Sequence, residues 1–95
     1  MRILVTGVAG LLGSHIADRM LELGHEVVGV DNLIGGYMDN VNEKVRFYKA
    51  DCGDLELMNE YIKGCDVVFM QLVLRMMVYR FGLHTLLRKI PLVLQ

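Results

Sequence analysis

The sequence predicts an α/β fold in which parallel strands alternate with helices, as the N-terminal part of an incomplete, doubly wound sheet. Three observations support this prediction. Apolar, strand-like runs alternate with segments of helical periodicity. A loop with three glycines joins the first run to the first helix, and an acidic residue follows the second run. A chain of 95 residues is too short for a complete two-half sheet with a substrate domain.

The first element is a buried strand at residues 2–6, which leads into Gly7, Gly10 and Gly13. Gly7 is expected to turn the chain sharply, Gly10 to leave room for phosphates, and Gly13 to let the helix pack closely on the strand. Free N–H groups at the start of the helix would then bind a pyrophosphate without a lysine. Because 10 of the 95 residues are glycine, a turn with only a packing role is the alternative.

The next two elements are a helix at residues 11–23 and a strand at residues 26–30. Gly24 ends the helix, and Ser14 and His15 are expected to have structural roles near its start. The helix has one apolar face, formed by Leu12, Ile16, Met20 and Leu23.

Asp31 follows the second strand, eighteen positions after Gly13, near the spacing expected for a carboxylate that holds the adenosine ribose. Its charge would repel the 2′-phosphate of NADP. No Arg or Lys lies between Arg19 and Lys44 to offset this repulsion, so NAD is favoured. Alternatively, Asp31 only starts a turn with Asn32.

The remaining elements are a loop at 32–44, a strand at 45–49, a short helix at 54–62 and a buried strand at 66–69. Asp51 or Asp54 could cap the short helix. Ligands of such sheets lie beyond the carboxyl ends of the strands, where the glycine loop and both acidic motifs fall.

Three motifs together resemble the extended short-chain dehydrogenase/reductase family, whose best-known members are nucleotide-sugar epimerases and dehydratases. These motifs are Thr-Gly-Val-Ala-Gly-Leu-Leu-Gly at 6–13, Asp-Asn-Leu at 31–33 with two glycines after it, and Phe-Tyr-Lys-Ala-Asp-Cys-Gly-Asp-Leu at 47–55. The resemblance covers residues 1 to about 69. It implies a Rossmann fold and NAD as the cofactor.

The resemblance also implies which residues hold NAD. Backbone N–H groups would contact the pyrophosphate, and two residues would hold the adenosine ribose. One further residue would meet the adenine ring through its carboxylate and the next through its backbone. The residues for the pyrophosphate are Gly10, Leu11 and Leu12, those for the ribose are Asp31 and Asn32, and those for adenine are Asp51, through its carboxylate, and Cys52, through its backbone.

The catalytic pair of this family, a Tyr and a Lys four positions later, has no counterpart in the chain. The residues four positions after its tyrosines are Val41, Cys52, Cys65 and Leu83. Ser14 is the only serine, so no Ser-His-Asp set is available. The sequence therefore predicts no catalytic residue, and the chain alone is expected to be inactive. A nucleotide sugar would be the substrate of a full-length relative only.

Cysteine usage and hydropathy limit the compartment and the partners. Cys52 and Cys65 lack the spacing of metal ligands, so a reduced cytoplasmic location and no metal are expected. The chain begins with a core strand, which leaves no room for a signal peptide, and it has no run of eighteen apolar residues. Nucleic acid and membrane are not expected as partners.

Charge divides the chain into an NAD-binding half-domain at 1–70 and an atypical basic, apolar tail at 71–95. The first part has 6 basic and 11 acidic residues, whereas the tail has 4 basic residues and no acid. One explanation is an amphipathic basic helix for a membrane surface or an acidic partner, although apolar residues interrupt its polar face. A second is an ordinary continuation of the domain as a buried helix and strand.

A third explanation is that the tail is out of frame. In this family the fourth strand usually ends in a turn such as Phe-His-Ala-Ala. The codons TTT CAT GCA GCT encode that turn, and loss of one T leaves Phe-Met-Gln followed by a leucine codon, which matches residues 69–72. We hypothesise that a deletion of one nucleotide, in the gene or in its sequencing, replaced everything after Phe69.

Two functions follow from these observations. The first is an NAD-binding fragment of an NAD-dependent nucleotide-sugar epimerase or dehydratase without the catalytic Tyr/Lys part. The alternative is a small nucleotide-binding regulatory module whose basic tail binds a partner or a membrane surface.

Overall fold

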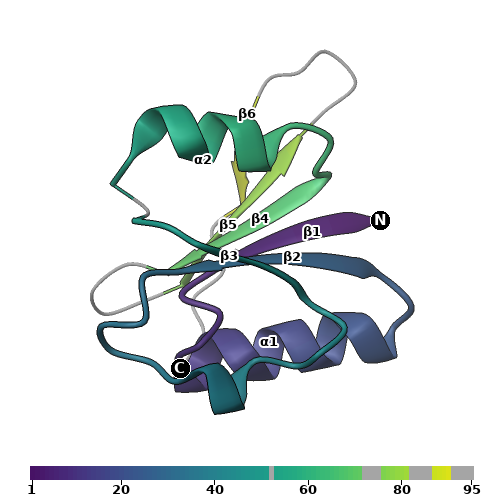
Figure 1. Cartoon of the computed structure of the whole chain (residues 1–95). Helices are drawn as coiled ribbons and strands as arrows, with labels where there is room; N and C mark the ends of the chain where they lie inside the picture. Colours follow the sequence, from purple (N-terminus) through teal and green to yellow (C-terminus); the bar gives the residue numbers. More distant parts are fainter. Residues whose placement is uncertain (52, 72–75, 82–86, 91–95) are drawn as a thin grey trace.

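The computed structural model describes residues 1–51, 53–71, 76–81 and 87–90. They form one sheet of strand order β3-β2-β1-β4-β5-β6, with helix α1 on one face and helix α2 on the other (Figure 1). Each side of the sheet therefore has a helix against which its apolar side chains can pack, which is the arrangement of an α/β domain.

The first four strands are parallel and alternate with the helices, as the sequence predicted. β1 pairs with β2 and β4, and β2 pairs with β3. The elements of this parallel part are β1 (Arg2–Thr6), α1 (Leu11–Glu22), β2 (Glu26–Asp31), the 3₁₀ turn η1 (Met38–Asn40), β3 (Arg46–Lys49), α2 (Leu55–Ile62) and β4 (Val67–Gln71). The expected incomplete Rossmann sheet is thus confirmed, with element ends within two residues of the prediction.

The core lies on both faces of β1, the central strand of the parallel part. Alternate side chains of a strand point to opposite faces of a sheet. Ile3 and Val5 accordingly join the cluster under α1, whereas Leu4 joins the cluster under α2. All three side chains are at most 1% exposed, and burial of each stabilises the fold by roughly 1.5–3 kcal/mol. This packing holds the end of β1 rigidly, where the glycine loop begins.

Specific residues begin and end the helices. The carboxylate of Asp54 accepts a hydrogen bond from the N–H of Leu57 at 3.2 Å and so caps α2, as one of the predicted alternatives proposed. α1 ends before Leu23 and Gly24, and Gly24 has a φ of +88°, which glycine adopts without strain. No helix among the described residues is long and apolar enough to cross a membrane.

The segment after β4 is extended where the structure describes it. β5 (Met76–Phe81) pairs antiparallel with β4, and β6 (Leu87–Ile90) pairs antiparallel with β5. The interpretation of this segment as an amphipathic helix is therefore wrong for residues 76–81 and 87–90. Unpaired N–H and C=O groups at the edge of β4 offer hydrogen bonds to any extended chain, and Val, Tyr and Phe at 78, 79 and 81 favour a strand.

Candidate nucleotide-binding site

The glycine loop is a tight turn between β1 and α1. Gly7 has a φ of +67°, and its N–H donates to the carbonyl oxygen of Val30 at 2.8 Å. The N–H of Gly10 donates back to the carbonyl oxygen of Gly7 at 3.0 Å. The loop is thus held by hydrogen bonds to β2 and to itself, and Gly7 supplies the left-handed conformation that the turn requires.

Gly13 has the packing role that its position predicted. A Cβ atom at this residue would overlap the carbonyl oxygen of Gly7. A Cβ at Gly10 would lie 3.2 Å from the same oxygen, a tight but less severe contact. Internal packing therefore demands glycine more strongly at Gly13 than at Gly10.

The N-terminus of α1 points out of the glycine loop and is free of negative charge. Gly10 provides no side-chain cap, and the first turn of α1 has no acidic residue. The first intrahelical hydrogen bond runs from the N–H of Ser14 to the carbonyl oxygen of Gly10. The N–H groups of Leu11, Leu12 and Gly13 come before it and have no acceptor within the helix, so they are suited to bind an anion.

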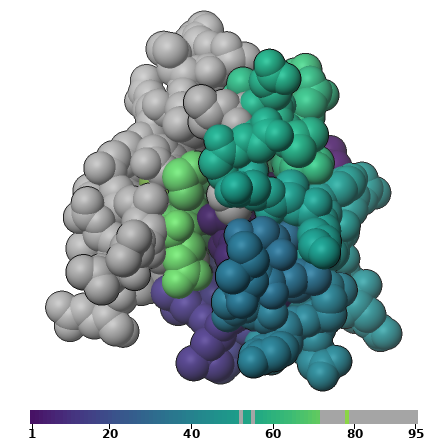
Figure 2. All heavy atoms as spheres, turned by 60° about the vertical axis from the view of Figure 1, so that its left-hand side comes forward, coloured from purple at the N-terminus to yellow at the C-terminus, as the bar shows by residue number. Residues whose placement is uncertain are grey.

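This region of the molecule is open to solvent. The side chain of Leu11 is 77% exposed although it is apolar. In Figure 2, purple atoms of the N-terminal part of the chain are visible between the blue segment that follows β2 and the green end of β4. A ligand can therefore approach the loop from this side.

Asp31 lies at the carboxyl end of β2 and is bonded directly to the glycine loop. Its side chain is buried, with Oδ2 accepting from the N–H of Ala9 at 3.0 Å and Oδ1 accepting from the N–H of Leu33 at 2.8 Å. A carboxylate has about four acceptor positions, so both oxygens can accept further donors. The bond to Leu33 is the local turn that the alternative explanation predicted, and the bond to Ala9 is additional.

The residues after Asp31 form a strained turn. Leu33 has a φ of +65°, the only positive φ of a non-glycine residue in the described part of the chain. Asn32 is exposed, and its Oδ1 accepts from the N–H of Ile34 at 3.0 Å. The Asn32 side chain thus stabilises the turn from which it is predicted to reach the ribose.

The loop between β2 and β3 is bound to the glycine loop through one carbonyl oxygen, that of Ala9. This oxygen accepts from the N–H of Tyr37 at 3.1 Å and from Nδ2 of Asn40 at 2.9 Å. The sequence predicted only a loop here and did not identify Asn40, since nothing in a Gly- and Asn-rich segment distinguishes one Asn from another. Both the N–H and the carbonyl group of Ala9 are therefore fixed by residues far along the chain.

Asp51 follows β3 at the same edge of the sheet. It is exposed, and its Oδ1 accepts from the N–H of Gly53 at 2.8 Å. Because Asp54 caps α2, the carboxylate of Asp51 is not needed for that purpose. Cys52, the other residue predicted to meet adenine, lies outside the described residues.

Gln71 is next to the glycine loop although the sequence assigned it to the tail. Its N–H donates to Oγ1 of Thr6 at 2.9 Å, and its Oε1 lies 2.9 Å from the position of a Cβ at Gly7. The chain order reverses between β1 and β4, the place where ligands of such sheets bind. A glutamine carboxamide thus lies at the switch point of the sheet.

The remaining thiol of the described chain takes no part in this site. Cys65 lies before β4, is only 5% exposed, and donates to the carbonyl oxygen of Tyr61 at 3.4 Å. Burial raises the pKa of the Cys65 thiol, and nearby Arg2 partly opposes this effect. The thiol is therefore neutral and structural.

Comparison with known proteins places this geometry in a family. The profile of the NAD dependent epimerase/dehydratase family matches residues 3–73. The chain belongs to this family. The match extends past Phe69, where the sequence predicted the resemblance to end, and reaches two residues beyond the end of β4 at Gln71.

Individual relatives of the family agree with this assignment. A UDP-glucose 4-epimerase of Mycolicibacterium smegmatis is 47% identical over 62 residues, which are 60% of this chain and 20% of that protein. A UDP-glucose 4-epimerase of Streptococcus mutans is 47% identical over 60 residues, 62% of this chain and 18% of that protein. The chain thus spans about a fifth of the length of these relatives.

Solved structures of the family share the fold. A Thermotoga maritima UDP-glucose 4-epimerase with UDP-glucose has a TM-score of 0.72 and 39% identity over 76% of this chain and 24% of its own. The Thermus thermophilus UDP-glucose 4-epimerase in complex with NAD has a TM-score of 0.68 and 38% identity over 79% of this chain and 25% of its own. NAD is therefore the cofactor found with this fold.

Proposed function

We propose that this chain holds the adenosine diphosphate part of NAD at the carboxyl edge of β1, β2 and β3. The N–H groups of Leu11 and Leu12, next to Gly10, bind the pyrophosphate. Asp31 and Asn32 hold the adenosine ribose, and Asp51 and the backbone of Cys52 contact adenine. The family to which the chain belongs uses NAD, which supports this cofactor.

The observation that carries the proposal is the hydrogen bond from Ala9 N–H to Asp31 Oδ2, 3.0 Å long. It connects the loop that would bind phosphate to the carboxylate that would bind ribose. A buried carboxylate fixed by backbone donors loses little conformational freedom when a ligand binds, so it is preorganised to accept ribose hydroxyls. A residue with only a turn role would need the bond to Leu33 and no bond to the glycine loop.

The charges of the site also suit NAD. The positive end of the α1 dipole and its free N–H groups favour the pyrophosphate. Asp31 is negative where the ribose carries hydroxyl groups, and a hydroxyl can donate to a carboxylate whereas a 2′-phosphate cannot. The cofactor without the 2′-phosphate is therefore preferred.

Catalysis belongs to the part of the relatives that this chain does not span. Hydride removal from a nucleotide sugar and its return would need the family's Tyr and Lys, and no tyrosine of this sequence is followed by Lys four positions later. We infer that the chain binds NAD but does not turn over a nucleotide sugar.

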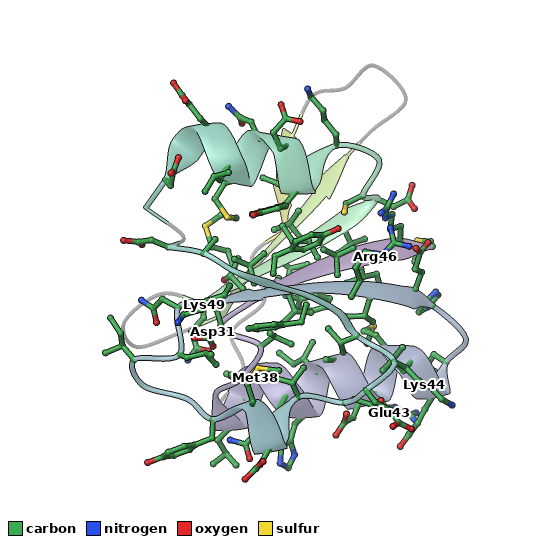
Figure 3. The ribbon with its side chains drawn as sticks, viewed as in Figure 1. Asp31, Met38, Glu43, Lys44, Arg46 and Lys49 are labelled. Carbon is green, nitrogen blue, oxygen red and sulfur yellow. The ribbon has the colours of Figure 1, made fainter. Side chains whose placement is uncertain are left out.

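Calorimetry with ADP-ribose tests the proposal on the 95-residue chain. ADP-ribose contains the pyrophosphate and adenosine groups that the site would contact. Asp31→Ala is expected to weaken its binding at least tenfold, since the variant loses the ribose acceptors. Glu43→Ala is the matched control, because Glu43 is an exposed acid at the opposite end of β3 from Asp31 (Figure 3).

Circular dichroism of both variants separates loss of binding from loss of folding. Folded Asp31→Ala protein that binds ADP-ribose as tightly as the wild type would contradict the ribose assignment. Absence of ADP-ribose binding by the folded wild-type chain would contradict the proposed function itself.

A further inference from the structure

The sheet brings a lysine next to Asp31, although the two residues are far apart in sequence. β2 and β3 are parallel, and their register pairs Asp31 with Lys49. Adjacent strands of a sheet are about 4.8 Å apart, so the two Cα atoms are close neighbours at the carboxyl edge. The sequence does not reveal this proximity, because Lys49 comes eighteen positions after Asp31 and only the strand register brings the two residues together.

The two side chains also share a face of the sheet. Phe47 packs on the cluster under α1, whereas Tyr48 and Ala50 pack on the cluster under α2. Because side chains alternate along a strand, Lys49 points to the same face as Phe47. Val27 belongs to the α1 cluster as well, which places Asp31 on that face by the same alternation.

Lys49 is available to a ligand. Its side chain is exposed, and the ion pairs within 4.0 Å among the described residues do not include it. Figure 3 places Lys49 beside Asp31 at one end of β2 and β3, whereas Lys44 and Arg46 lie at the other end. A flexible four-carbon stem lets the ammonium reach a group bound next to Asp31.

We propose that Lys49 determines how strongly this site discriminates between NAD and NADP, by offsetting the charge of Asp31 at the 2′ position of the adenosine ribose. The inference rests on the proposed function, since it requires the ribose at Asp31. Asp31 disfavours a 2′-phosphate, and Lys49 attracts it. The site consequently prefers NAD but accepts NADP with a smaller loss of affinity than Asp31 alone would impose.

The charge of the 2′-phosphate makes this contribution measurable. A phosphate monoester carries a charge of about −1.5 to −2 at pH 7, so a single lysine near it has a larger effect than on a hydroxyl group. Screening by salt reduces the attraction between exposed charges. A purely structural effect of Lys49 would change the binding of both ligands equally and would not depend on salt in this way.

The test measures the dissociation constants of ADP-ribose and of 2′-phospho-ADP-ribose for the 95-residue chain at low salt. Lys49→Gln is expected to weaken the binding of 2′-phospho-ADP-ribose about tenfold relative to the binding of ADP-ribose. Lys49→Glu is expected to weaken it further. In each Lys49 variant, the ratio of the two dissociation constants should move toward the wild-type ratio when the ionic strength is raised to about 0.5 M. Lys44→Gln, an exposed lysine remote from Asp31, should leave the ratio unchanged.

The outcomes separate this inference from the proposed function. Tight ADP-ribose binding with a ratio that changes less than about twofold in both Lys49 variants overturns the role of Lys49 and leaves the NAD site intact. No ADP-ribose binding by the wild type overturns both. An equal change in Lys44→Gln would mean a long-range charge effect, which also overturns the specific role of Lys49.

Discussion

The parallel strands β1 to β4 and the antiparallel strands β5 and β6 are held in the same sheet by different features of the sequence. The parallel part combines a glycine, Gly13, whose replacement would bring a side chain against the backbone of Gly7, with alternating apolar side chains and helices on both faces. In the antiparallel part, β4, β5 and β6 are neighbours in the sheet in the same order as in the sequence, and β5 lies along the edge of β4.

The parallel part depends on more specific features of the sequence than the antiparallel part. Parallel pairing needs crossover connections, so β1 to β4 depend on the correct packing of α1 and α2. Antiparallel pairing at an open edge needs only an extended segment with a compatible hydrogen-bonding pattern. We therefore expect substitutions to be far more damaging in the parallel part than in the antiparallel part.

The largest effect is expected for Gly13→Val. The new side chain would overlap the carbonyl oxygen of Gly7 and separate α1 from β1, at a cost of about 3 kcal/mol or more in the free energy of unfolding. Urea denaturation of the variant and the wild type measures this loss in the free energy of unfolding. Gly35→Ala is the control, because a Cβ there has no atom within 4 Å and the backbone φ is not positive. Equal stability of the two variants would refute the packing role of Gly13.

A direct comparison of the two regions comes from the same substitution in each. Val5 in β1 is fully buried and Val78 in β5 is 7% exposed. Val5→Ala is expected to lower the free energy of unfolding by about 2–3 kcal/mol and Val78→Ala by about 1 kcal/mol, because the region around β1 cannot collapse onto the cavity. A larger loss for Val78→Ala would show that β5 belongs to the cooperative core.

A smaller effect is expected where the parallel strands meet at the switch point. Thr6→Val removes the hydroxyl that accepts from the N–H of Gln71 and leaves that donor without its partner, at a cost of about 1 kcal/mol. Thr6→Ser keeps the hydroxyl and should retain most of the stability. Thermal unfolding of both variants checks the prediction, which fails if Val is tolerated as well as Ser.

Much of the parallel part could be predicted from the sequence because its signals are local. The spacing of Gly7, Gly10 and Gly13 and the acid at the end of β2 define the loop and its partner strand. Asn40, Lys49 and Gln71 could not be found in this way, since their proximity to the site depends on strand register and on a long loop. The antiparallel pairing of β5 and β6 could not be predicted, because it depends on the open edge of β4 as well as on the strand propensity of the segment itself.

We also propose that the contrast between the regions has a genetic origin. Resequencing of the locus is expected to find one additional T in the codons for Phe69 and the residue after it, which would restore Phe-His-Ala-Ala. Relatives that share Met70-Gln71-Leu72 and the residues after them would contradict a deletion.

An NMR titration of the ¹⁵N-labelled chain with NAD tests whether the cofactor binds to the parallel part of the sheet. We expect the backbone N–H signals of the glycine loop, of the α1 start and of the turn after Asp31 to shift, while those of β5 and β6 do not. Shifts concentrated in residues 76–81 and 87–90, with none at Leu11, Leu12 or Gly13, would contradict it.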